Sequence, residues 1–474
     1  MLTSPQSDFS KWYLDLVQAA DLCDYAPVKG CIIFKPYGYR IWELLRDELD
    51  QRIKQLGVEN AYFPMLIPES FIKREAEHVE GFAPELLTAT RVGENELDEP
   101  YVLRPTSETI IYDSYAKWIH SYRDLPVKMN QWANIIRWEK RPRPFLRTSE
   151  FLWQEGHTVH ATREEADQMV MDALEMYDQF EQEVLALSGI KGRKSDAEKF
   201  PGAEYTTTIE VLAKDGKSIQ SGTSHQLGQG FAKSFNIQFT NKEEQLTYPW
   251  ITSWGVTTRL IGTVIMIHGD EKGLRLPPRI APYQVVIVPI TLGKEQPALM
   301  DKVYEIQNEL QRLGVRVKID NRDDKSPGFK FNEWELKGVP LRLELGPKDL
   351  ANESVMAFRR DLNQKFAINF SEIKQIPQIL AEIQDELLNQ ANEFLQSHII
   401  DVFDWEKFCE VIEDQRGFAR VNWCGEGECE KKIKEKTKAT SRCIPFAEMQ
   451  KEVKGGCVHC GKPAKHITLF AKAY

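Results

Sequence analysis

Hydrophobic positions with two different periods divide the first 280 residues into helices and strands. Within 37–56 apolar residues recur every three or four positions, which predicts an amphipathic helix that ends at Gly57. A second amphipathic helix is predicted over 164–188. Short β-rich runs predict strands at 61–66, 101–103, 132–136, 151–157, 205–212, 235–240 and 260–268. We therefore expect a mixed, mainly antiparallel sheet with helices packed against it.

The pattern changes near residue 283, where buried strands begin to alternate with helices. Strands are predicted at 283–290, 315–320 and 341–345, and helices at 295–313, 327–337 and 373–394. This alternation indicates a small α/β unit with a largely parallel sheet. Residues 397–404 have the composition of a linker. We expect three units, which span 1–282, 283–396 and 405–474.

Composition narrows the class of protein. Hydrophobic residues make up 42% of the 474, and 61 Lys and Arg against 71 Asp and Glu give a net charge of −10. The chain can therefore build proper cores, and any nucleic acid must meet local basic patches. The start of the chain contains the charged residues Asp8, Lys11 and Asp15, whereas a signal peptide has an uninterrupted apolar core. The most apolar run, 260–267, is too short to span a bilayer. We expect a cytoplasmic protein with no membrane partner.

Six of the eight cysteines lie after residue 408, an uneven distribution that is not typical of a disulfide scaffold. Four of them form two closely spaced pairs, Cys424 with Cys429 and Cys457 with Cys460. Two pairs of thiolates predict tetrahedral zinc, and four protein ligands indicate a structural ion. Reduced surface thiols are the alternative, which the clustering disfavours. Cys443 and His459 are further candidate ligands.

Two motifs carry arginines beside predicted strands. Arg137 and Glu139 follow the strand at 132–136 and precede a loop with three further arginines. A guanidinium group stays charged and binds phosphate with two hydrogen bonds, although ordinary surface ion pairs would also explain such a loop. The second motif, 253–259, ends in Arg259 and contains Gly255, which admits close approach of a ligand. A packed turn is the alternative there.

Two further motifs place acids, hydroxyls and histidines near strands. Thr106 and Glu108 could present acceptors to a small cation such as a secondary ammonium. They could equally cap a helix, with Thr106 as N-cap, and both interpretations can hold together. The stretch 220–230 is polar and rich in glycine, and buried polar groups need partners, which a ligand can supply. His225 within it could instead be a satisfied core histidine.

Together these motifs resemble class II aminoacyl-tRNA synthetases, and within them the prolyl-tRNA synthetase family of archaeal and eukaryotic type. The resemblance covers nearly the whole chain. Residues 38–64 look like the first class II motif, which forms the dimer interface, 137–155 like the second and 255–259 like the third. The resemblance implies a class II antiparallel-sheet catalytic domain, an α/β anticodon-binding domain and a C-terminal zinc-binding α+β domain.

The resemblance also implies a role for each matching residue. Those expected to line a proline pocket are Thr106, Glu108, Arg137, Trp153, Glu155, His157 and His225. Those expected to bind ATP are Arg137, Glu139, Arg147, Thr148, Phe151, Gln220, Thr223, Thr257 and Arg259, with Phe151 and Arg259 sandwiching the adenine. Anticodon bases would meet Glu335, Arg342 and Lys348. Tyr474 matches the terminal tyrosine of the family.

The implied reaction joins L-proline to tRNA(Pro) in two steps. The proline carboxylate attacks the α-phosphorus of ATP, and the terminal ribose hydroxyl of the tRNA then attacks the adenylate. Arg137, Arg259 and Mg²⁺ would neutralise charge in the first step, which needs no acid–base residue. The expected partners are proline, tRNA(Pro) and a second copy of the chain.

Two alternatives remain open: a catalytically silent relative that binds tRNA, and a threonyl enzyme. The complete set of arginines argues against the first, and the position of the cysteines outside the pocket against the second. About ninety residues separate His157 from Ser253, too few for an editing insertion. We expect no hydrolysis of alanyl-tRNA. Alanine and cysteine should be activated at some level, since one methylene is worth only ~1–3 kcal/mol.

Overall fold

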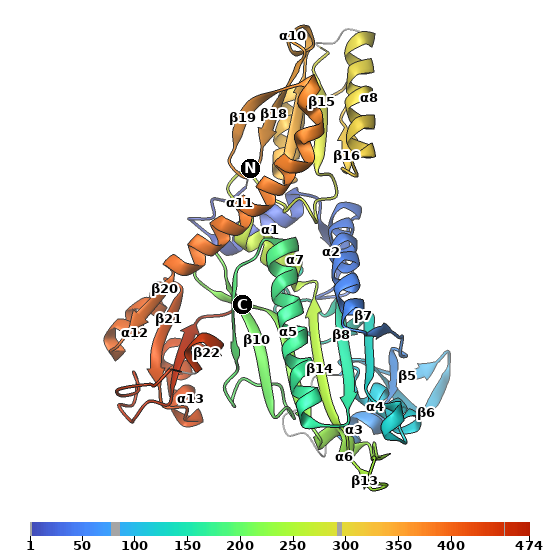
Figure 1. Cartoon of the computed structure of the whole chain (residues 1–474), viewed down its shortest axis with the longest axis vertical. Helices are drawn as coiled ribbons and strands as arrows, with labels where there is room; N and C mark the ends of the chain where they lie inside the picture. Colours follow the sequence, from blue (N-terminus) through green and yellow to red (C-terminus); the bar gives the residue numbers. More distant parts are fainter. Residues whose placement is uncertain (1, 77–85, 292–295, 450) are drawn as a thin grey trace.

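A computed structural model describes residues 2–76, 86–291, 296–449 and 451–474. A large sheet runs through the lower part of the molecule, and a separate α/β unit stands above it (Figure 1). In order across the large sheet, the strands are β20 (Ile399–Val402), β21 (Phe418–Trp423), β23 (His466–Ala471), β22 (Thr440–Pro445), β9 (Gly189–Arg193), β10 (Tyr205–Leu212), β11 (Ser218–Gly228), β14 (Trp250–Thr257), β8 (Glu150–His160), β7 (Val127–Ile136) and β3 (Glu59–Asn60).

Neighbouring strands of this sheet are antiparallel, apart from the outermost pair at each edge. There β3 runs parallel to β7, and β20 runs parallel to β21. The antiparallel catalytic sheet predicted from the sequence is therefore confirmed.

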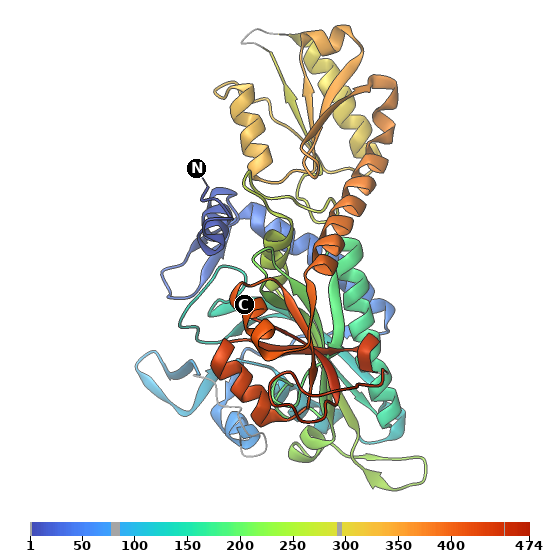
Figure 2. The same ribbon diagram turned by 90° about the vertical axis from the view of Figure 1, so that its left-hand side faces the viewer.

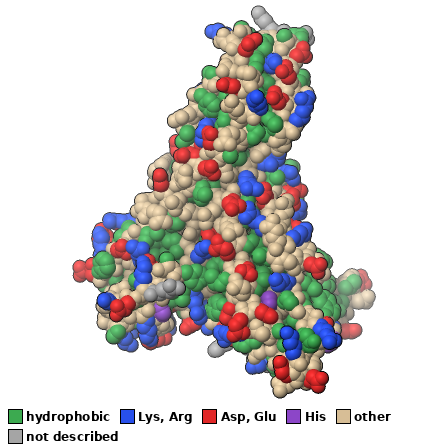
Figure 3. All heavy atoms as spheres, in the orientation of Figure 1, with side chains coloured by type: hydrophobic (Ala, Val, Ile, Leu, Met, Phe, Trp, Pro, Cys, Tyr) green, Lys and Arg blue, Asp and Glu red, His purple; other side chains and the backbone are tan. Residues whose placement is uncertain are grey.

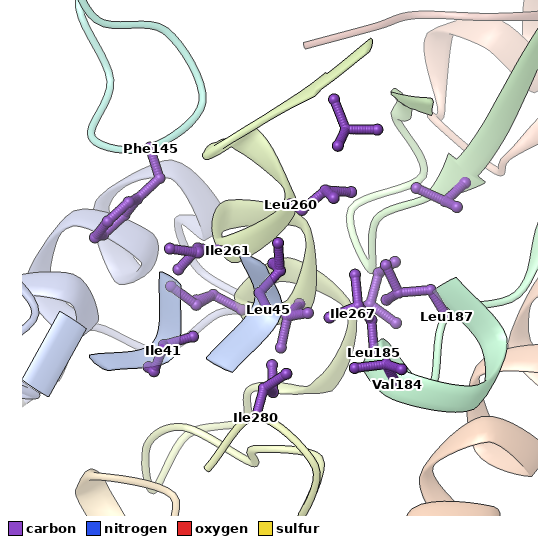
Figure 4. Close-up of a cluster of buried hydrophobic side chains, with 14 of the residues drawn as sticks. Ile41, Leu45, Phe145, Val184, Leu185, Leu187, Leu260, Ile261, Ile267 and Ile280 are labelled. Atoms are coloured by element: carbon purple, nitrogen blue, oxygen red, sulfur yellow. The ribbon is translucent and has the colours of Figure 1, made fainter. Parts of the chain in front are cut away.

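One hydrophobic cluster is shared by the sheet and several helices, among them α2 (Pro36–Gln55), α5 (Arg163–Leu185) and α7 (Arg259–His268). Figure 4 shows Leu45 of α2, Leu185 of α5 and Leu260 of α7 directed into this cluster. Fully burying one such side chain stabilises the fold by roughly 1.5–3 kcal/mol. The apolar stripe of α2 is thus covered within its own chain.

Three predicted strands are wrong. The run 260–268 lies in helix α7, where every residue from Leu260 onward is buried, and a short continuous apolar run fits a buried helix as well as a buried strand. Of the run 61–66 only Leu66 is strand, as the first residue of β4 (Leu66–Pro68), while 61–65 connect β3 to β4, since Pro64 has no N–H to donate to a ladder. Of 235–240 only β12 (Phe239–Thr240) is strand.

The upper unit holds a five-stranded sheet. Its strand order is β16 (Val317–Ile319), β15 (Val285–Pro289), β17 (Leu341–Leu345), β18 (Ser354–Arg359) and β19 (Gln364–Asn369). The first three strands are parallel, and β18 and β19 pair antiparallel. The predicted largely parallel sheet is therefore correct only for β16, β15 and β17. The accompanying helices are α8 (Pro297–Arg312), α9 (Pro327–Leu336), α10 (Pro347–Ala351) and α11 (Ile376–Ser397). The predicted start of α8 at Glu295 lies outside the described residues.

The C-terminal unit pairs directly with the catalytic sheet and is not connected through a flexible linker. The predicted linker is wrong, because it contains β20, which pairs with β21 directly after α11. The helices of the unit are α12 (Trp405–Glu413), α13 (Gly427–Thr437) and α14 (Phe446–Met449). Strand β22 pairs with β9 through Ile444 and Pro445, which makes one continuous sheet. In Figure 2 this unit lies in front of the catalytic strands.

Smaller elements surround the catalytic sheet. They are α1 (Phe9–Ala19), the hairpin β1 (Cys23–Tyr25) and β2 (Ile32–Phe34), α3 (Glu69–Ala76), β5 (Thr88–Val92), β6 (Asn95–Leu103), α4 (Glu108–Trp118), α6 (Gly230–Ser234) and β13 (Leu246–Thr247). On the face shown in Figure 3, acidic and basic side chains are interspersed over all three units. Among the described helices, none has the length and apolar character that a bilayer crossing requires.

Candidate active site

A cavity of about 480 Å³ opens over strands β8, β11 and β14. The structure brings together around it every residue that the sequence predicted for the proline and ATP sites. These are Thr106, Glu108, Arg137, Glu139, Arg147, Thr148, Phe151, Trp153, Glu155, His157, Gln220, Thr223, His225, Thr257 and Arg259. They come from separate parts of the chain, so the fold, and not sequence proximity, collects them.

Strand register explains how this floor is built. Gly255 on β14 lies opposite Glu155 on β8 and Thr223 on β11. Alternate residues of a strand face the same side, so these neighbours point into the cavity together. A Cβ at Gly255 would lie 2.9 Å from the carbonyl oxygen of Gln154, closer than real contacts allow. The glycine thus keeps the middle of the floor open.

A buried acid and imidazole form the deepest part of the cavity. His157 Nε2 lies 2.9 Å from Glu155 Oε2, while the other carboxyl oxygen accepts from Ser107 Oγ at 2.5 Å and Gln131 Nε2 at 2.8 Å. Tyr112 OH lies 3.1 Å from His157 Nδ1. Burial alone would lower the pKa of His157, but the hydrogen bond and charge of Glu155 outweigh it and raise that pKa. The pair is therefore held rigidly in a polar network.

Glu108 begins helix α4 beside this pair. Ser107, and not Thr106, occupies the N-cap position, so the predicted cap is wrong. The Ser107 side chain makes no capping bond because its hydroxyl donates to Glu155. Thr106 Oγ1 instead donates to Glu108 Oε2. The two residues therefore present one hydroxyl–carboxylate unit to the cavity.

Three arginines, Arg137, Arg147 and Arg259, place positive charge on one side of the cavity. Arg137 Nε donates to the Pro105 carbonyl at 2.7 Å, which directs its guanidinium over the Trp153 ring, 5.5 Å from the ring centroid. Burial, together with repulsion by Arg147 and Arg137, lowers the pKa of Arg259 to about 10. Within the described ranges, none of the three arginines has a carboxylate partner at ion-pair distance. Cations gathered without counter-charge are suited to an anionic ligand.

His225 fits both interpretations offered by the sequence. It lines the cavity, and its Nδ1 lies 2.9 Å from Thr206 Oγ1, with the Phe200 ring centroid 4.8 Å away. Burial lowers the pKa of His225 to about 3, and the charge of His157 contributes to the same shift. The imidazole is therefore neutral at physiological pH, and it is held in place before any ligand arrives.

Sequence reasoning missed the segment between β9 and β10. Lys194, Glu198, Lys199, Phe200 and Pro201 all line the cavity. No motif marked them, because a loop of mixed charge looks like an ordinary solvated connection. The burial of the Lys194 ammonium cannot be predicted from the local sequence, because it depends on the C-terminal unit packing against β9.

The four predicted cysteine ligands form a second candidate site. The sulfur atoms of the four cysteines all lie within 4.8 Å of one another. The Cys429–Cys457 and Cys424–Cys460 sulfur separations are 3.7 Å, against roughly 3.8 Å for thiolates bound tetrahedrally to zinc at about 2.3 Å. The donor set therefore fits zinc.

The two further candidate ligands differ. His459 Nδ1 lies 3.3 Å from Cys429 Sγ, at the margin of the cluster. Cys443 is fully buried on β22, outside the cluster, where burial raises the pKa of its thiol. Cys443 is therefore wrong as a candidate ligand.

The anticodon candidates lie in the upper unit. Arg342 is 3% exposed and binds Glu335 Oε1 at 2.8 Å and Glu344 Oε1 at 2.9 Å. Its guanidinium lies between the rings of Phe331 and Phe358. Lys348, on α10, is exposed. Arg342 thus sits in the ion-pair network that the sequence offered as an alternative.

Three models of known families match successive parts of the chain. The tRNA synthetase class II core domain (G, H, P, S and T) matches 91–268, the anticodon binding domain 284–378, and the prolyl-tRNA synthetase C-terminal domain 405–474. These matches fall on the catalytic sheet, the upper unit and the cysteine-bearing unit described above.

Similar proteins cover the whole chain. A proline–tRNA ligase of Lachnoclostridium phytofermentans is 52% identical over 474 residues, which are 100% of this chain and 98% of that protein. One of Clostridium novyi is 51% identical over the same shares. The crystal structure of prolyl-tRNA synthetase from Cryptosporidium parvum complexed with halofuginone and AMPPNP superposes with a TM-score of 0.96 at 42% identity. It covers 100% of this chain and 99% of that one.

Proposed function

The chain belongs to the prolyl-tRNA synthetase family, and from this premise we propose how its cavity binds proline and ATP. Its activity is that of a proline–tRNA ligase, a class II aminoacyl-tRNA synthetase that uses ATP. The observation that carries the proposal is the joint placement, around one cavity, of the buried Glu155–His157 pair and of three arginines that have no carboxylate partner among the described residues. An amino acid and a nucleotide need these opposite charges side by side.

Proline occupies the acidic end of the cavity. Its secondary ammonium meets the Thr106–Glu108 unit, and its carboxylate is directed toward Arg137. The ring lies against Trp153, with Glu155, His157 and His225 closing the floor. The network of hydrogen bonds behind Glu155 and His157 supports this arrangement because it holds the pocket shape without a ligand.

ATP occupies the basic end. Arg137 contacts the α-phosphate, and Phe151 and Arg259 enclose the adenine, near which Glu139 lies. The remaining polar contacts come from Arg147, Thr148, Gln220, Thr223 and Thr257. Three guanidinium groups that lack a carboxylate partner among the residues the structure describes support this assignment, since binding an anion costs them no ion pair seen there.

The first step needs placement and charge neutralisation, not proton transfer. A carboxylate oxygen of proline attacks the α-phosphorus, the bond to the bridging oxygen breaks, and pyrophosphate leaves. Arg137 and Arg259 stabilise the charge that develops on the phosphoryl oxygens. In the second step the terminal ribose hydroxyl attacks the adenylate carbonyl and AMP leaves. Carboxylates on the cavity wall and phosphate oxygens together suit Mg²⁺, which would neutralise phosphate charge.

Zinc bound by Cys424, Cys429, Cys457 and Cys460 is structural. The four thiolates would fill every position of a tetrahedral ion and leave none for substrate. Such an ion would join the residue after β21 and helix α13 to the loop before β23, within a unit that spans 405–474. The catalytic unit spans 1–282 and the anticodon-binding unit 283–396.

tRNA(Pro) contacts the upper unit through Glu335 and Lys348, while Arg342 fixes Glu335 from behind. The enzyme acts in the cytoplasm as a homodimer. Tyr62 and Leu66, which are 71% and 45% exposed beside the edge strand β3, support a partner surface there. The molar mass of the purified protein in solution tests the dimer.

ATP–pyrophosphate exchange against each of the twenty amino acids tests the assignment of the cavity. Strong exchange with proline that is lost in Arg137→Ala is the expected result. Exchange that favours threonine would mean that the amino-acid end has been assigned incorrectly. Exchange with no amino acid would favour a tRNA-binding regulator.

A further inference from the structure

A buried carboxylate, Glu210 on β10, lies beside the arginine side of the cavity with both oxygens fully engaged. Lys194 Nζ and Thr208 Oγ1 donate to Oε1 at 2.6 and 3.0 Å. Ser218 Oγ and Arg442 Nε donate to Oε2 at 2.6 and 2.9 Å. Glu210 is 0% exposed. Burial would raise its pKa, but the charges of Arg442 and Lys194 dominate and hold that pKa at about 2, so the group is ionised.

One of these four donors belongs to the C-terminal unit. Arg442 lies on β22 and reaches across to the catalytic strand, where a second nitrogen, Nη2, also lies 2.9 Å from Glu210 Oε2. Lys194 strengthens the junction because it also donates to the Arg442 carbonyl at 2.9 Å. One of the two charged groups that bind Glu210, the Arg442 guanidinium, thus comes from the C-terminal unit that carries the cysteine cluster.

Glu210 is also a neighbour of Arg259. It pairs across the β10–β11 ladder with Gln220, whose carbonyl accepts from Arg259 Nη1 at 3.4 Å. Among the groups acting on the pKa of Arg259, burial and three arginines lower it, and Glu210 is the carboxylate that raises it. Buried charges are stable when paired, so a free Glu210 oxygen would attract this guanidinium.

We propose that Arg442 is a positioning residue for nucleotide binding: it saturates Glu210 and so keeps Arg259 free to bind the anionic nucleotide. The inference rests on the proposed placement of Arg259 in the ATP site. Without Arg442, one Glu210 oxygen loses its charged donor, and Arg259 is an adjacent, partly buried cation that has no carboxylate partner within the described part of the chain. An Arg259–Glu210 ion pair would then compete with ATP. Proline, at the other end of the cavity, would be unaffected.

The test compares KM for ATP and for proline in ATP–pyrophosphate exchange, with full-length, zinc-loaded protein. Arg442→Met raises KM for ATP about tenfold, the size of coupling expected within one charge network. KM for proline stays within about twofold. Arg442→Lys, which keeps the charge, stays near wild type. Arg442→Met combined with Glu210→Gln returns KM for ATP toward wild type, since a neutral amide does not hold Arg259.

Arg420→Met is the matched control. Arg420 also lies on a strand of the C-terminal unit and pairs with a carboxylate, Asp401, at 2.6 Å, but at the surface. Its loss leaves both KM values unchanged. Thermal midpoints of all variants separate a change in stability from a change in nucleotide binding.

Two outcomes would overturn the inference. One is an unchanged KM for ATP in folded Arg442→Met. Another is a double variant that regains its thermal midpoint but keeps the high KM, which would make Arg442 purely structural. If Arg442→Met does not fold, Arg442→Gln replaces it under the same criteria. Arg259→Ala keeps the two proposals apart: if KM for ATP does not rise there, the ATP-site assignment itself fails.

Discussion

Glu155 and His157 lie two residues apart on β8 and are joined by a 2.9 Å contact between Oε2 and Nε2 at the floor of the cavity. Their spacing places both side chains on the same face of the strand. Each is held from outside the strand as well, Glu155 by Gln131 and His157 by Tyr112. The floor is therefore organised before substrate binds.

This pair predicts a pH-dependent contribution to stability. The pKa of His157 is raised in the folded protein, so its contribution is complete below the unfolded value of about 6.5. The contribution is lost as pH rises through the raised folded value. The thermal midpoint of wild type should exceed that of His157→Gln most at low pH, and the gap should narrow as pH rises above the unfolded value and through the raised folded one. A gap that does not change with pH would show that folding leaves the pKa of His157 unchanged, and a gap that widens as pH rises would show that His157 is neutral when folded.

Removal of the Arg137 guanidinium should abolish adenylate formation with little loss of stability. Arg137 is the arginine nearest both the acid pair and the aromatic wall, and loss of one such charge-stabilising donor costs on the order of 10²–10³ in rate. Arg137→Ala is measured by proline-dependent pyrophosphate exchange. Arg141→Ala, in the same loop but exposed and outside the cavity, is the control and should retain activity.

The sequence predicted the site better than it predicted the elements around it. Each residue of the site stood in a motif such as 253–259, where a glycine and a terminal arginine adjoin a strand. The sequence predicts a strand where helix α7 directly follows, because a short apolar run that is buried throughout fits either element.

Contacts between distant units could not be predicted in the same way. Glu210 and Arg442 are 232 residues apart, and neither belongs to a motif. Nothing in the local pattern marks Lys194 as buried, since its burial depends on strand β22 pairing with β9. Long-range ion pairs follow from how the sheets join, which periodicity does not encode.

Glu181 should make the protein less stable as pH rises. Burial raises the pKa of Glu181 to about 8, although Ser221 Oγ donates to it at 2.7 Å. Its stabilising contribution is present below the unfolded value of about 4.5 and is lost as pH approaches 8. The thermal midpoint of wild type should therefore fall relative to Glu181→Gln between about pH 5 and 8.

Glu175 on the same helix is the matched control for that experiment. Its hydrogen bond to Lys191 lowers its pKa, so Glu175→Gln should show no such relative gain at high pH. Parallel curves for wild type and Glu181→Gln would mean that Glu181 is ionised in the folded protein.

Loss of one zinc ligand should weaken the fold more than the pocket. Cys424→Ser leaves three thiolates, and structural zinc contributes folding free energy directly, so we expect a fall in thermal midpoint of about 10 °C or more. Metal content by mass spectrometry should fall with it, while KM for proline changes little. Cys409→Ser, outside the cluster on α12, should leave both metal and midpoint unchanged. An unchanged midpoint with loss of proline specificity would instead indicate a metal that contacts substrate.

Alanine should be activated, yet the resulting alanyl-tRNA should not be hydrolysed by this chain. The residues between His157 and Ser253 form α5, β9, β10, β11, α6, β12 and β13, which belong to the catalytic unit itself and carry no inserted domain. Alanine lacks the ring of proline, and each missing methylene costs only ~1–3 kcal/mol, so discrimination by binding is incomplete. Pyrophosphate exchange with alanine should therefore be measurable and weaker than with proline. Release of alanine from purified alanyl-tRNA(Pro) should not exceed the rate without enzyme, and faster release would place a hydrolytic site within the catalytic unit.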